Sequence, residues 1–248
     1  MIEFRHVCAG YGDTDVLKDI SFTVPKGSFT ALIGPNGCGK TTLLRAAAGL
    51  LPLRSGEILL DGRPLLSYGR KELARTAAFL PQVRSIPGIT VGALVAHGRF
   101  PYLGLSRQMR EEDRTAVRRA MDETGVSQWA NRDLRELSGG ERQRVYIAMA
   151  LAQDTDIIFL DEPTAYLDPA GQFELLDLVA ELNRRGKTVV TVLHELSHAL
   201  TRSQQVILLE NGRVAAQGTP EEIVSGGAAE RVFRIRIHRA EGTYYITP

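Results

Sequence analysis

The sequence predicts an α/β fold whose core has an N-terminal antiparallel β subdomain and an inserted helical subdomain. A glycine-rich stretch at 34–42 lies between an apolar, β-rich run and a helical run. A second apolar run at 157–160 is continuous, as is typical of a strand buried on both faces. Helical patterns and dense arginines dominate residues 90–135. We therefore expect a single domain with a core at 1–85 and 155–225, a helical subdomain at about 86–154 and a C-terminal β extension at about 226–248.

Turn residues and apolar periods delimit the individual elements. Glycine, proline or aspartate turns end the early strands, and Asn211-Gly212 indicates a hairpin. Thr219 and Pro220 begin a short capped helix. The predicted strands are residues 2–7, 16–24, 29–33, 57–60, 77–80, 157–160, 188–193, 206–209 and 213–217. The predicted helices are residues 43–50, 69–75, 90–97, 111–124, 142–152, 169–185 and 195–201. In the tail, apolar residues alternate with basic ones, which predicts a half-buried strand through Phe233, Ile235 and Ile237 with 244–246 as its hairpin partner.

Composition narrows the class of protein. Thirty Lys and Arg face 29 Asp and Glu, and a net charge of +1 argues against wholesale binding to nucleic acid. Cys8 and Cys38 are too far apart to suggest a metal site or a disulfide framework. The N-terminus does not resemble a signal peptide, and apolar runs fall short of the 18 or more residues of a membrane span. Any role at a membrane is therefore expected to depend on a partner.

The stretch after the strand at 29–33 reads G-P-N-G-C-G-K-T-T and is typical of a phosphate-binding loop. Its glycines let backbone N–H groups point at an anion, and a helix starting near Lys40 adds the positive end of its dipole. Lys40 would reach the β- and γ-phosphates, and Thr41 would ligate magnesium. The alternative is an ordinary glycine turn. The candidate binding residues are Gly34, Pro35, Asn36, Gly37, Cys38, Gly39, Lys40, Thr41 and Thr42, with Cys38 a small filler that contributes only backbone.

Two carboxylates follow the buried strand at 157–160. A strand of this kind ends at the sheet edge where α/β proteins bind ligands. Asp161 is suited to hold magnesium there, and Glu162 to orient and deprotonate water. A solvated turn is the alternative. His194 follows the strand at 188–193 and points to the same edge, whereas the other histidines have no such placement.

Two further positions do not by themselves indicate a function. Tyr11 would either stack on a purine base or simply end a strand, and Gln82 taken alone would be a loop amide with no function. Ser138, Gly139, Gly140 and Glu141 precede a long helix and offer either a second anion-binding terminus or a plain N-cap.

The segment 98–105, which reads G-R-F-P-Y-L-G-L, leaves two possibilities open. It either tucks its aromatic residues inward or exposes them as a protein docking surface. The arginines on the following helix are expected to form a solvated face, with Glu111, Glu112 and Asp113 as counter-charges.

With these residues in place, the chain resembles the nucleotide-binding subunit of ABC transporters over essentially its whole length. Seven motifs occur in the family's order: an A-loop aromatic (Tyr11), Walker A (34–42), Q-loop (Gln82), signature (137–141), Walker B (157–161) with Glu162, D-loop (165–168) and H-loop (His194). Glu141, Tyr166 and Glu195 stand where the family more often has Gln, Ala and Asp. The resemblance is closer to one branch of the family, the ATPases of importers of iron siderophores, haem and cobalamin. This closer resemblance is carried by segments 98–105, 137–145 and 152–157.

The resemblance implies a mechanism. ATP and Mg²⁺ are the expected ligands, with Thr41, Gln82 and Asp161 at the metal. The catalytic residues would be Glu162 as general base, His194, Gln82 and Lys40. Two chains would pack head to tail, so that Ser138, Gly139, Gly140 and Glu141 complete the partner's ATP site and Asp168 crosses the interface. A groove at 83–105 would receive a helix of a membrane subunit.

The resemblance also implies a cellular role. We expect a homodimer at the cytoplasmic face of the membrane, held there by two permease subunits and served indirectly by a periplasmic or surface substrate-binding protein. It would energise uptake of an iron chelate, haem or cobalamin. The alternatives are the ATPase of an ABC exporter and a non-transport ABC ATPase.

Overall fold

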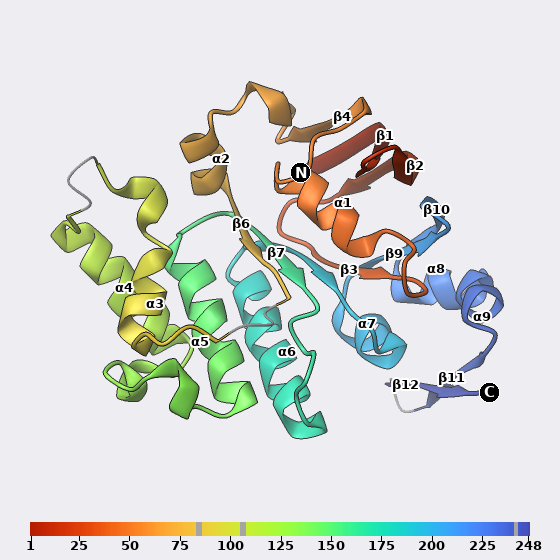
Figure 1. Ribbon diagram of the computed structural model, residues 1–248. Coiled ribbons are helices and arrows are strands. Elements are labelled where there is room, and N and C mark those ends of the chain that lie inside the picture. The colour runs from red at the N-terminus through yellow and green to blue at the C-terminus, as the bar shows by residue number, and fades with distance from the viewer. Residues whose placement is uncertain (83–85, 105–107, 241–242) are drawn as a thin grey trace.

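Two sheets form the core, and helix α1 (Lys40–Ala47) packs between them (Figure 1). The computed structural model describes residues 1–82, 86–104, 108–240 and 243–248. Leu43 and Leu44 of α1 are fully buried against apolar side chains from both sheets. The predicted helix at 43–50 is thus confirmed with earlier bounds. It ends at Ala47 because Gly49 adopts a φ of 69°, which is left-handed.

The smaller sheet is antiparallel and contains the N-terminus. Its strand order is β2-β1-β4-β5. These strands are β1 (Ile2–Tyr11), β2 (Thr14–Val24), β4 (Ser55–Leu60) and β5 (Arg63–Pro64). Irregularities in the pairing of β1 with β2, after Phe4 and after Val7, let β1 run four residues beyond its predicted end at residue 7 and reach Tyr11.

The larger sheet has the order β10-β9-β3-β8-β7-β6. Its strands are β3 (Phe29–Ile33), β6 (Ala77–Leu80), β7 (Ile157–Asp161), β8 (Thr188–Val192), β9 (Gln205–Glu210) and β10 (Arg213–Gly218). All pairs are parallel except β9 with β10. Asn211 and Gly212 form that hairpin with φ angles of 51° and 80°, the left-handed pair that such a two-residue turn requires.

Helices cover the other face of the parallel sheet. They are α5 (Gly139–Ala152), α6 (Pro169–Arg184) and α7 (Leu196–Arg202). Alternate residues of β3 serve the two faces, since Ala31 packs toward these helices and Leu32 toward α1. The parallel sheet is therefore buried on both sides, as its continuous apolar runs predict.

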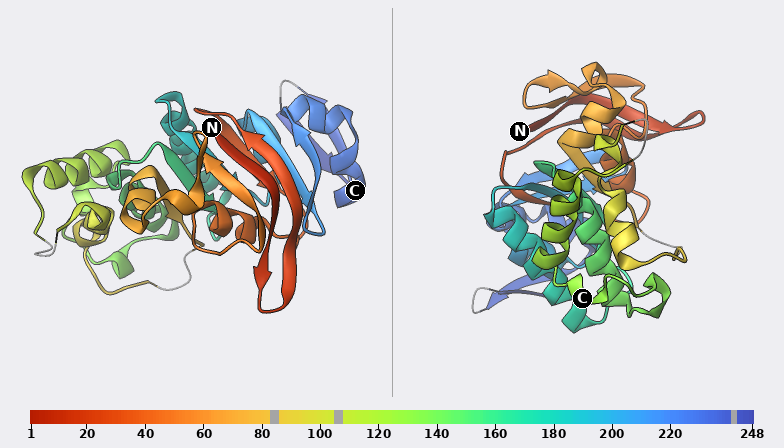
Figure 2. Two further views of the ribbon diagram at one scale, coloured as in Figure 1. Left: turned by 90° about the horizontal axis from the view of Figure 1, so that it is seen from above. Right: turned by 90° about the vertical axis from the view of Figure 1, so that its left-hand side faces the viewer.

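The helical subdomain lies at one end of the molecule and the C-terminal helices at the other (Figures 1 and 2). It is formed by α3 (Val91–His97), α4 (Glu111–Glu123) and the first part of α5, with α2 (Arg70–Thr76) nearby. Short 3-10 turns occur at Leu65–Ser67, Phe100–Tyr102, Ser127–Trp129 and Leu134–Glu136. The subdomain boundaries at 86 and 154 stay a prediction.

A buried ion pair ties the helical subdomain together. The Arg99 side chain donates from Nε to Asp113 Oδ1 at 3.0 Å and from Nη1 to Ala152 O at 2.9 Å. Asp113 was expected among the solvated counter-charges, and that expectation is wrong, because this carboxylate is buried beside Arg99. The expected solvated face does form at Glu111, which pairs with Arg114 and Arg118.

The tail differs from its prediction. Helices α8 (Pro220–Ser225) and α9 (Ala228–Phe233) precede the hairpin of β11 (Arg236–Ala240) and β12 (Thr243–Thr247). Phe233 therefore ends a helix, and Ile235 lies between helix and strand. The predicted strand through both residues is wrong because Arg234 adopts a left-handed φ of 57° and turns the chain. The predicted hairpin pairing is confirmed.

Among the described residues, no helix combines the length and apolarity needed to cross a membrane.

Candidate active site

Four strands of the parallel sheet end at one edge, and the predicted residues follow them. The glycine loop follows β3, Gln82 comes two residues after β6, Asp161 ends β7 and Glu162 follows it, and His194 comes two residues after β8. Because the carboxyl ends of parallel strands share an edge, segments from distant parts of the sequence meet here.

The loop after β3 needs glycine at particular positions. Gly34 has a φ of 147°, and a Cβ there would lie 2.2 Å from the Leu209 carbonyl oxygen and 2.7 Å from Cys38 Sγ. Gly39 has a φ of 108°, and its Cβ would lie 2.9 Å from Leu17 Cδ2. Cys38 is buried, and burial raises the pKa of its thiol above the usual value. Cys38 thus fills space beneath the loop in protonated form.

The Lys40 ammonium lies inside the curve of this loop. Its Nζ donates to the carbonyl oxygens of Gly34 at 2.7 Å and Pro35 at 3.0 Å. The pocket beside it has a volume of about 160 Å³ and is lined by Val16, Asn36, Gly37, Gly39, Lys40, Thr41, Thr42 and Glu162. A buried cation, backbone N–H groups and the start of an eight-residue helix together suit a chain of phosphates.

Thr41 and Asp161 form a direct contact between α1 and β7. The Thr41 hydroxyl donates to Asp161 Oδ1 at 2.8 Å. Asp161 is buried, and that burial raises the pKa of its carboxyl above the usual value, although the bond from Thr41 acts in the opposite direction. A hydroxyl and a buried carboxylate are hard oxygen donors, so the pair fits a magnesium ion held together with substrate phosphates.

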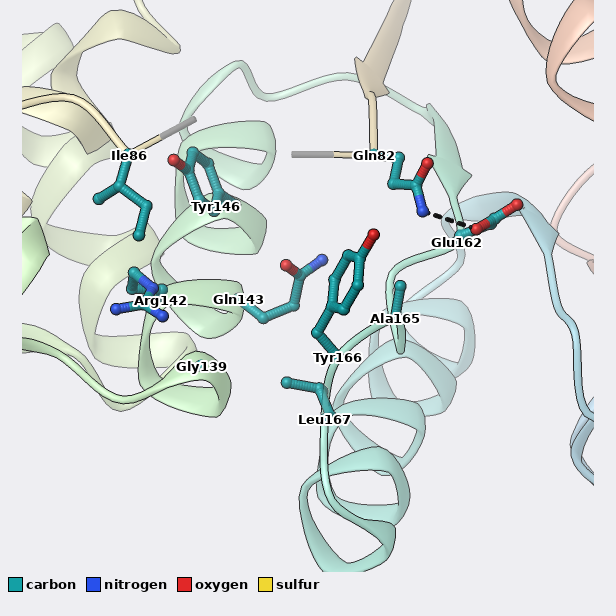
Figure 3. A pocket seen from close by; sticks show the side chains of 10 residues that line it. All are labelled: Gln82, Ile86, Gly139, Arg142, Gln143, Tyr146, Glu162, Ala165, Tyr166 and Leu167. Carbon is teal, nitrogen blue, oxygen red and sulfur yellow. Dashed lines mark hydrogen bonds between the residues drawn. The ribbon is translucent and has the colours of Figure 1, made fainter. Parts of the chain in front are cut away.

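Glu162 is held between two side chains from neighbouring strand ends. Gln82 Nε2 donates to Glu162 Oε2 at 2.8 Å, and His194 Nε2 lies 2.7 Å from Glu162 Oε1. Glu162 has a left-handed φ of 53°, which is unusual for a residue with a side chain and directs it back toward the sheet edge. Figure 3 shows Gln82 and Glu162 on one wall of a pocket and Arg142, Gln143 and Tyr146 of α5 facing them.

Tyr11 lies at the end of β1 and is 46% exposed. Arg45 Nη1 donates to its hydroxyl at 3.4 Å, which places the ring beside α1, the helix that follows the glycine loop. Both predicted alternatives therefore stay possible, because the ring ends a strand and is also accessible to a base.

The signature residues lie at a second pocket. Ser138 caps α5: its Oγ accepts from the Glu141 N–H at 3.3 Å, and Glu141 Oε2 accepts from the Ser138 N–H at 2.7 Å. This bond from Ser138 lowers the pKa of Glu141 below its usual value. The N-cap alternative is thus observed. The second pocket, of about 670 Å³, contains Ser138, Gly139, Gly140, Tyr166 and Asp168 in its lining, and these differ from the residues that line the phosphate pocket.

Asp168 begins α6. Its Oδ1 accepts from the Gly171 N–H at 2.8 Å, and the residue is exposed. Tyr166 is 81% exposed with a left-handed φ of 66°. The segment from Ala165 to Asp168 therefore has an exposed aromatic side chain and an exposed carboxylate that caps α6.

The segment from Gly98 to Gly104 combines the two predicted alternatives; Leu105 lies outside the described residues, as do positions 83–85 of the predicted groove. Tyr102 turns inward, donating from its hydroxyl to Gln153 O at 3.0 Å and lying under the Arg99 guanidinium. Phe100 is 55% exposed and stacks on His97 with ring centroids 4.5 Å apart.

Several residues near the site were missed from the sequence, among them Arg142, Gln143 and Tyr146 in the pocket beside Glu162. Val16 lines the phosphate pocket, and Arg45 contacts Tyr11. Arg45 could have been found from the sequence, because it follows Thr41 by one helical turn and therefore lies on the same face of the helix. No sequence feature singles out Val16, because an apolar residue at the start of a strand is common.

A strand, a glycine loop with a buried lysine, a helix and a buried aspartate at the end of another strand of the same sheet define a P-loop nucleotide-binding protein. A family model described as "ABC transporter" matches residues 17–165. The chain belongs to this ABC transporter family, and it is an ATP-binding ATPase coupled to transport. The fold class predicted from the sequence is confirmed.

Two curated relatives are similar over almost the whole chain. The petrobactin import ATP-binding protein FpuD of Bacillus anthracis is 43% identical, with 100% of this chain and 91% of the relative covered. The ferric enterobactin transport ATP-binding protein FepC of Escherichia coli (strain K12) is 46% identical, with 92% and 84% covered. A solved structure described as the dimeric structure of MJ0796, a bacterial ABC transporter cassette, aligns with a TM-score of 0.77 and 30% identity, covering 89% of this chain and 99% of that one.

Proposed function

We propose that this chain is the ATP-hydrolysing subunit of an ABC importer that takes up an iron chelate of the siderophore class. The observation that carries the proposal is its similarity, over at least nine-tenths of its length, to relatives named for petrobactin import and ferric enterobactin transport. Haem and cobalamin, the other cargoes implied by the sequence motifs, receive no support from those two names.

The first part of the site is proposed to bind the nucleotide. Residues 34–42 hold the phosphates, with the Lys40 ammonium leaving the Gly34 and Pro35 carbonyls to contact them. Tyr11 stacks on the base from its exposed position. Thr41 and Asp161, already in contact, hold Mg²⁺ together with Gln82. When bound, the ion offsets negative charge on the phosphates.

The second part is proposed to act on water. Glu162 serves as general base, accepting a proton from a water that its carboxylate orients. His194 and Gln82 hold that carboxylate from both sides, which fixes its direction before substrate arrives. His194 then also contacts the γ-phosphate, and Lys40 stabilises its charge.

We further propose that two chains complete each other's sites. Ser138, Gly139, Gly140 and Glu141 line a pocket separate from the phosphate pocket of their own chain. A head-to-tail dimer would bring them to the γ-phosphate of the partner, with Asp168 crossing the interface. The exposure of the segment from Ala165 to Asp168 supports this, as does the similarity to a cassette whose structure is described as dimeric.

The proposed membrane partners are two permease subunits, with a periplasmic or surface substrate-binding protein acting through them. They would hold the dimer at the cytoplasmic face of the membrane. The docking surface is proposed to include the exposed ring of Phe100.

Affinity capture of a tagged Glu162→Gln chain with ATP, from detergent-solubilised membranes of its source, tests the importer proposal. Mass spectrometry is expected to identify a permease with many membrane spans and a substrate-binding protein. An exporter-type membrane protein, or soluble partners alone, would overturn import while leaving the ATPase chemistry intact. Binding of iron siderophore, haem and cobalamin to the recovered substrate-binding protein then identifies the cargo.

A further inference from the structure

The exposed segment at 165–168 packs against the start of α5. A Cβ added to Gly139 would lie 3.6 Å from the Tyr166 carbonyl oxygen and 3.8 Å from Leu167 Cδ2, both ordinary contact distances. The signature glycine and the segment that carries Asp168 are therefore neighbours within one chain.

The same segment is bonded to α7 through two polar side chains. Gln172 of α6 donates from Nε2 to the Leu167 carbonyl oxygen at 3.2 Å, and its Oε1 lies 3.1 Å from His198 Nε2. Glu195 Oε2 lies 3.0 Å from the same nitrogen. An amide oxygen and a carboxylate only accept hydrogen bonds, so His198 Nε2 carries the hydrogen; it donates to Gln172 Oε1, and the Glu195 carboxylate lies beside it.

His198, at the centre of this bridge, is shielded from water, whereas the Glu195 side chain is 54% exposed. His198 is 7% exposed, and the Phe173 ring meets its imidazole edge-on with centroids 4.9 Å apart. Hydrogen bonds in such surroundings fix side-chain positions more strongly than exposed ones. Because Glu195 directly follows His194, the bridge starts next to the histidine that contacts Glu162 and ends at Leu167, which lies beside Gly139.

We propose that His198 and Gln172 are positioning residues that couple the two ATP sites of the dimer. The inference rests on the proposed function, in which His194 serves the chain's own ATP and Gly139 the partner's. A shift of the His194–Glu195 segment on contact with the γ-phosphate would move Leu167 through the bridge and so change the surface offered to the second site. Two ends of one hydrogen-bonded path then respond to two different ligands.

Steady-state ATP hydrolysis by the chain, assembled with its membrane partner, tests the bridge. His198→Leu and Gln172→Leu are each expected to lower kcat about five- to tenfold, as expected for loss of the partly buried hydrogen bond that the two side chains share, with KM for ATP within about twofold. His198→Gln, which restores an N–H donor near the position of Nε2, is expected to recover most of kcat. The double variant is expected to be no slower than either single variant, because both break one path.

Phe173→Leu is the matched control, since it alters packing on His198 but leaves the hydrogen bonds intact, and it is expected to keep the kcat of the unmodified chain. If His198→Leu fails to fold, the partly exposed Gln172 carries the test. Unchanged kcat in the Leu variants, additive losses, or equal losses in Phe173→Leu would overturn the bridge while unmodified activity upholds the proposed function. An unmodified assembly that hydrolyses no ATP would overturn both.

Discussion

His194 Nε2 lies 2.7 Å from Glu162 Oε1, so the histidine after β8 and the carboxylate after β7 are in direct contact. Gln82 occupies the other carboxylate oxygen at 2.8 Å. A general base held from both sides loses little orientational freedom when water and the γ-phosphate arrive.

Glu162→Gln is expected to lower kcat for ATP hydrolysis at least about 100-fold, because an amide cannot accept the proton from water. The variant should still bind ATP and accumulate as an ATP-bound dimer, observed by size-exclusion chromatography with and without ATP. Glu181→Gln is the control, since that carboxylate of α6 pairs with Arg184 and Arg185 and lines neither the phosphate pocket nor the pocket of Ser138. Hydrolysis at the unmodified rate would remove Glu162 as the base.

Lys40→Ala is expected to weaken ATP binding by about 2–4 kcal/mol, or roughly 30- to 900-fold in Kd, through loss of charge-assisted bonds to phosphate. Isothermal titration calorimetry measures this directly. Lys26→Ala provides a matched loss of charge at the opposite end of β3, where Lys26 pairs with Asp61, and should bind ATP normally. Equal affinity of Lys40→Ala and the unmodified chain would show that the lysine does not contact phosphate.

The positions of the candidate site residues were predictable because local patterns and sheet geometry agree on them. The continuous apolar run at 157–160 is enough by itself to predict that Asp161 and Glu162 lie at the ligand edge of the sheet. The S-x-x-E pattern of Ser138 and Glu141 is also typical of the capping box observed at α5. By contrast, the contact of Gln82 with Glu162 joins residues 80 positions apart, and no local pattern encodes it.

The errors have the same physical origin. Asp113 looked like a solvated counter-charge because its neighbours in sequence are acidic, but a partner 14 residues away buries it. In the tail, alternation of apolar and basic residues suits a strand, yet a left-handed Arg234 ends α9 and delays the strand. Tertiary contacts and a single backbone conformation therefore override local periodicity at these two places.

Asp113→Ala is expected to destabilise the chain by about 3–5 kcal/mol, because it leaves the buried Arg99 guanidinium without its counter-charge. Chemical denaturation monitored by circular dichroism measures the change in unfolding free energy. Glu111→Ala is the matched control on the same helix, and it should cost far less because its arginine partners are exposed. Similar losses in the two variants would contradict a structural role for the buried pair.

The ion pair of Asp133 and Arg135 predicts a pH effect just before the signature. Side-chain bonds from Arg135, at 2.9 and 2.8 Å, hold the pKa of Asp133 at about 2, below its usual value of 3.8. A pKa lowered by folding stabilises the folded state above pH 3.8, and this contribution disappears as the pH falls through about 2.

Arg135→Leu should therefore raise the pKa of Asp133 toward 3.8, although not fully, because the Arg135 backbone N–H still donates to the carboxylate. Carboxyl-carbon NMR titration measures the shift. Arg132→Leu, which removes a guanidinium paired with Glu136 instead, should leave Asp133 unchanged. A pKa that stays near 2 in Arg135→Leu would mean that another group sets it.

Phe100 and Tyr102 are two residues apart, yet they are expected to respond to mutation in different ways. Phe100 is 55% exposed, so Phe100→Ala should leave the melting temperature nearly unchanged but reduce recovery of the permease in affinity capture at least about tenfold, as for an aromatic anchor at an interface. Tyr102→Phe removes the bond to Gln153 O and should cost about 1 kcal/mol of stability without affecting capture. One variant tests the surface and the other the interior of the same short segment. An unchanged melting temperature would show that any loss of capture by Phe100→Ala does not come from a damaged fold. Undiminished capture by Phe100→Ala would exclude this ring from the docking surface.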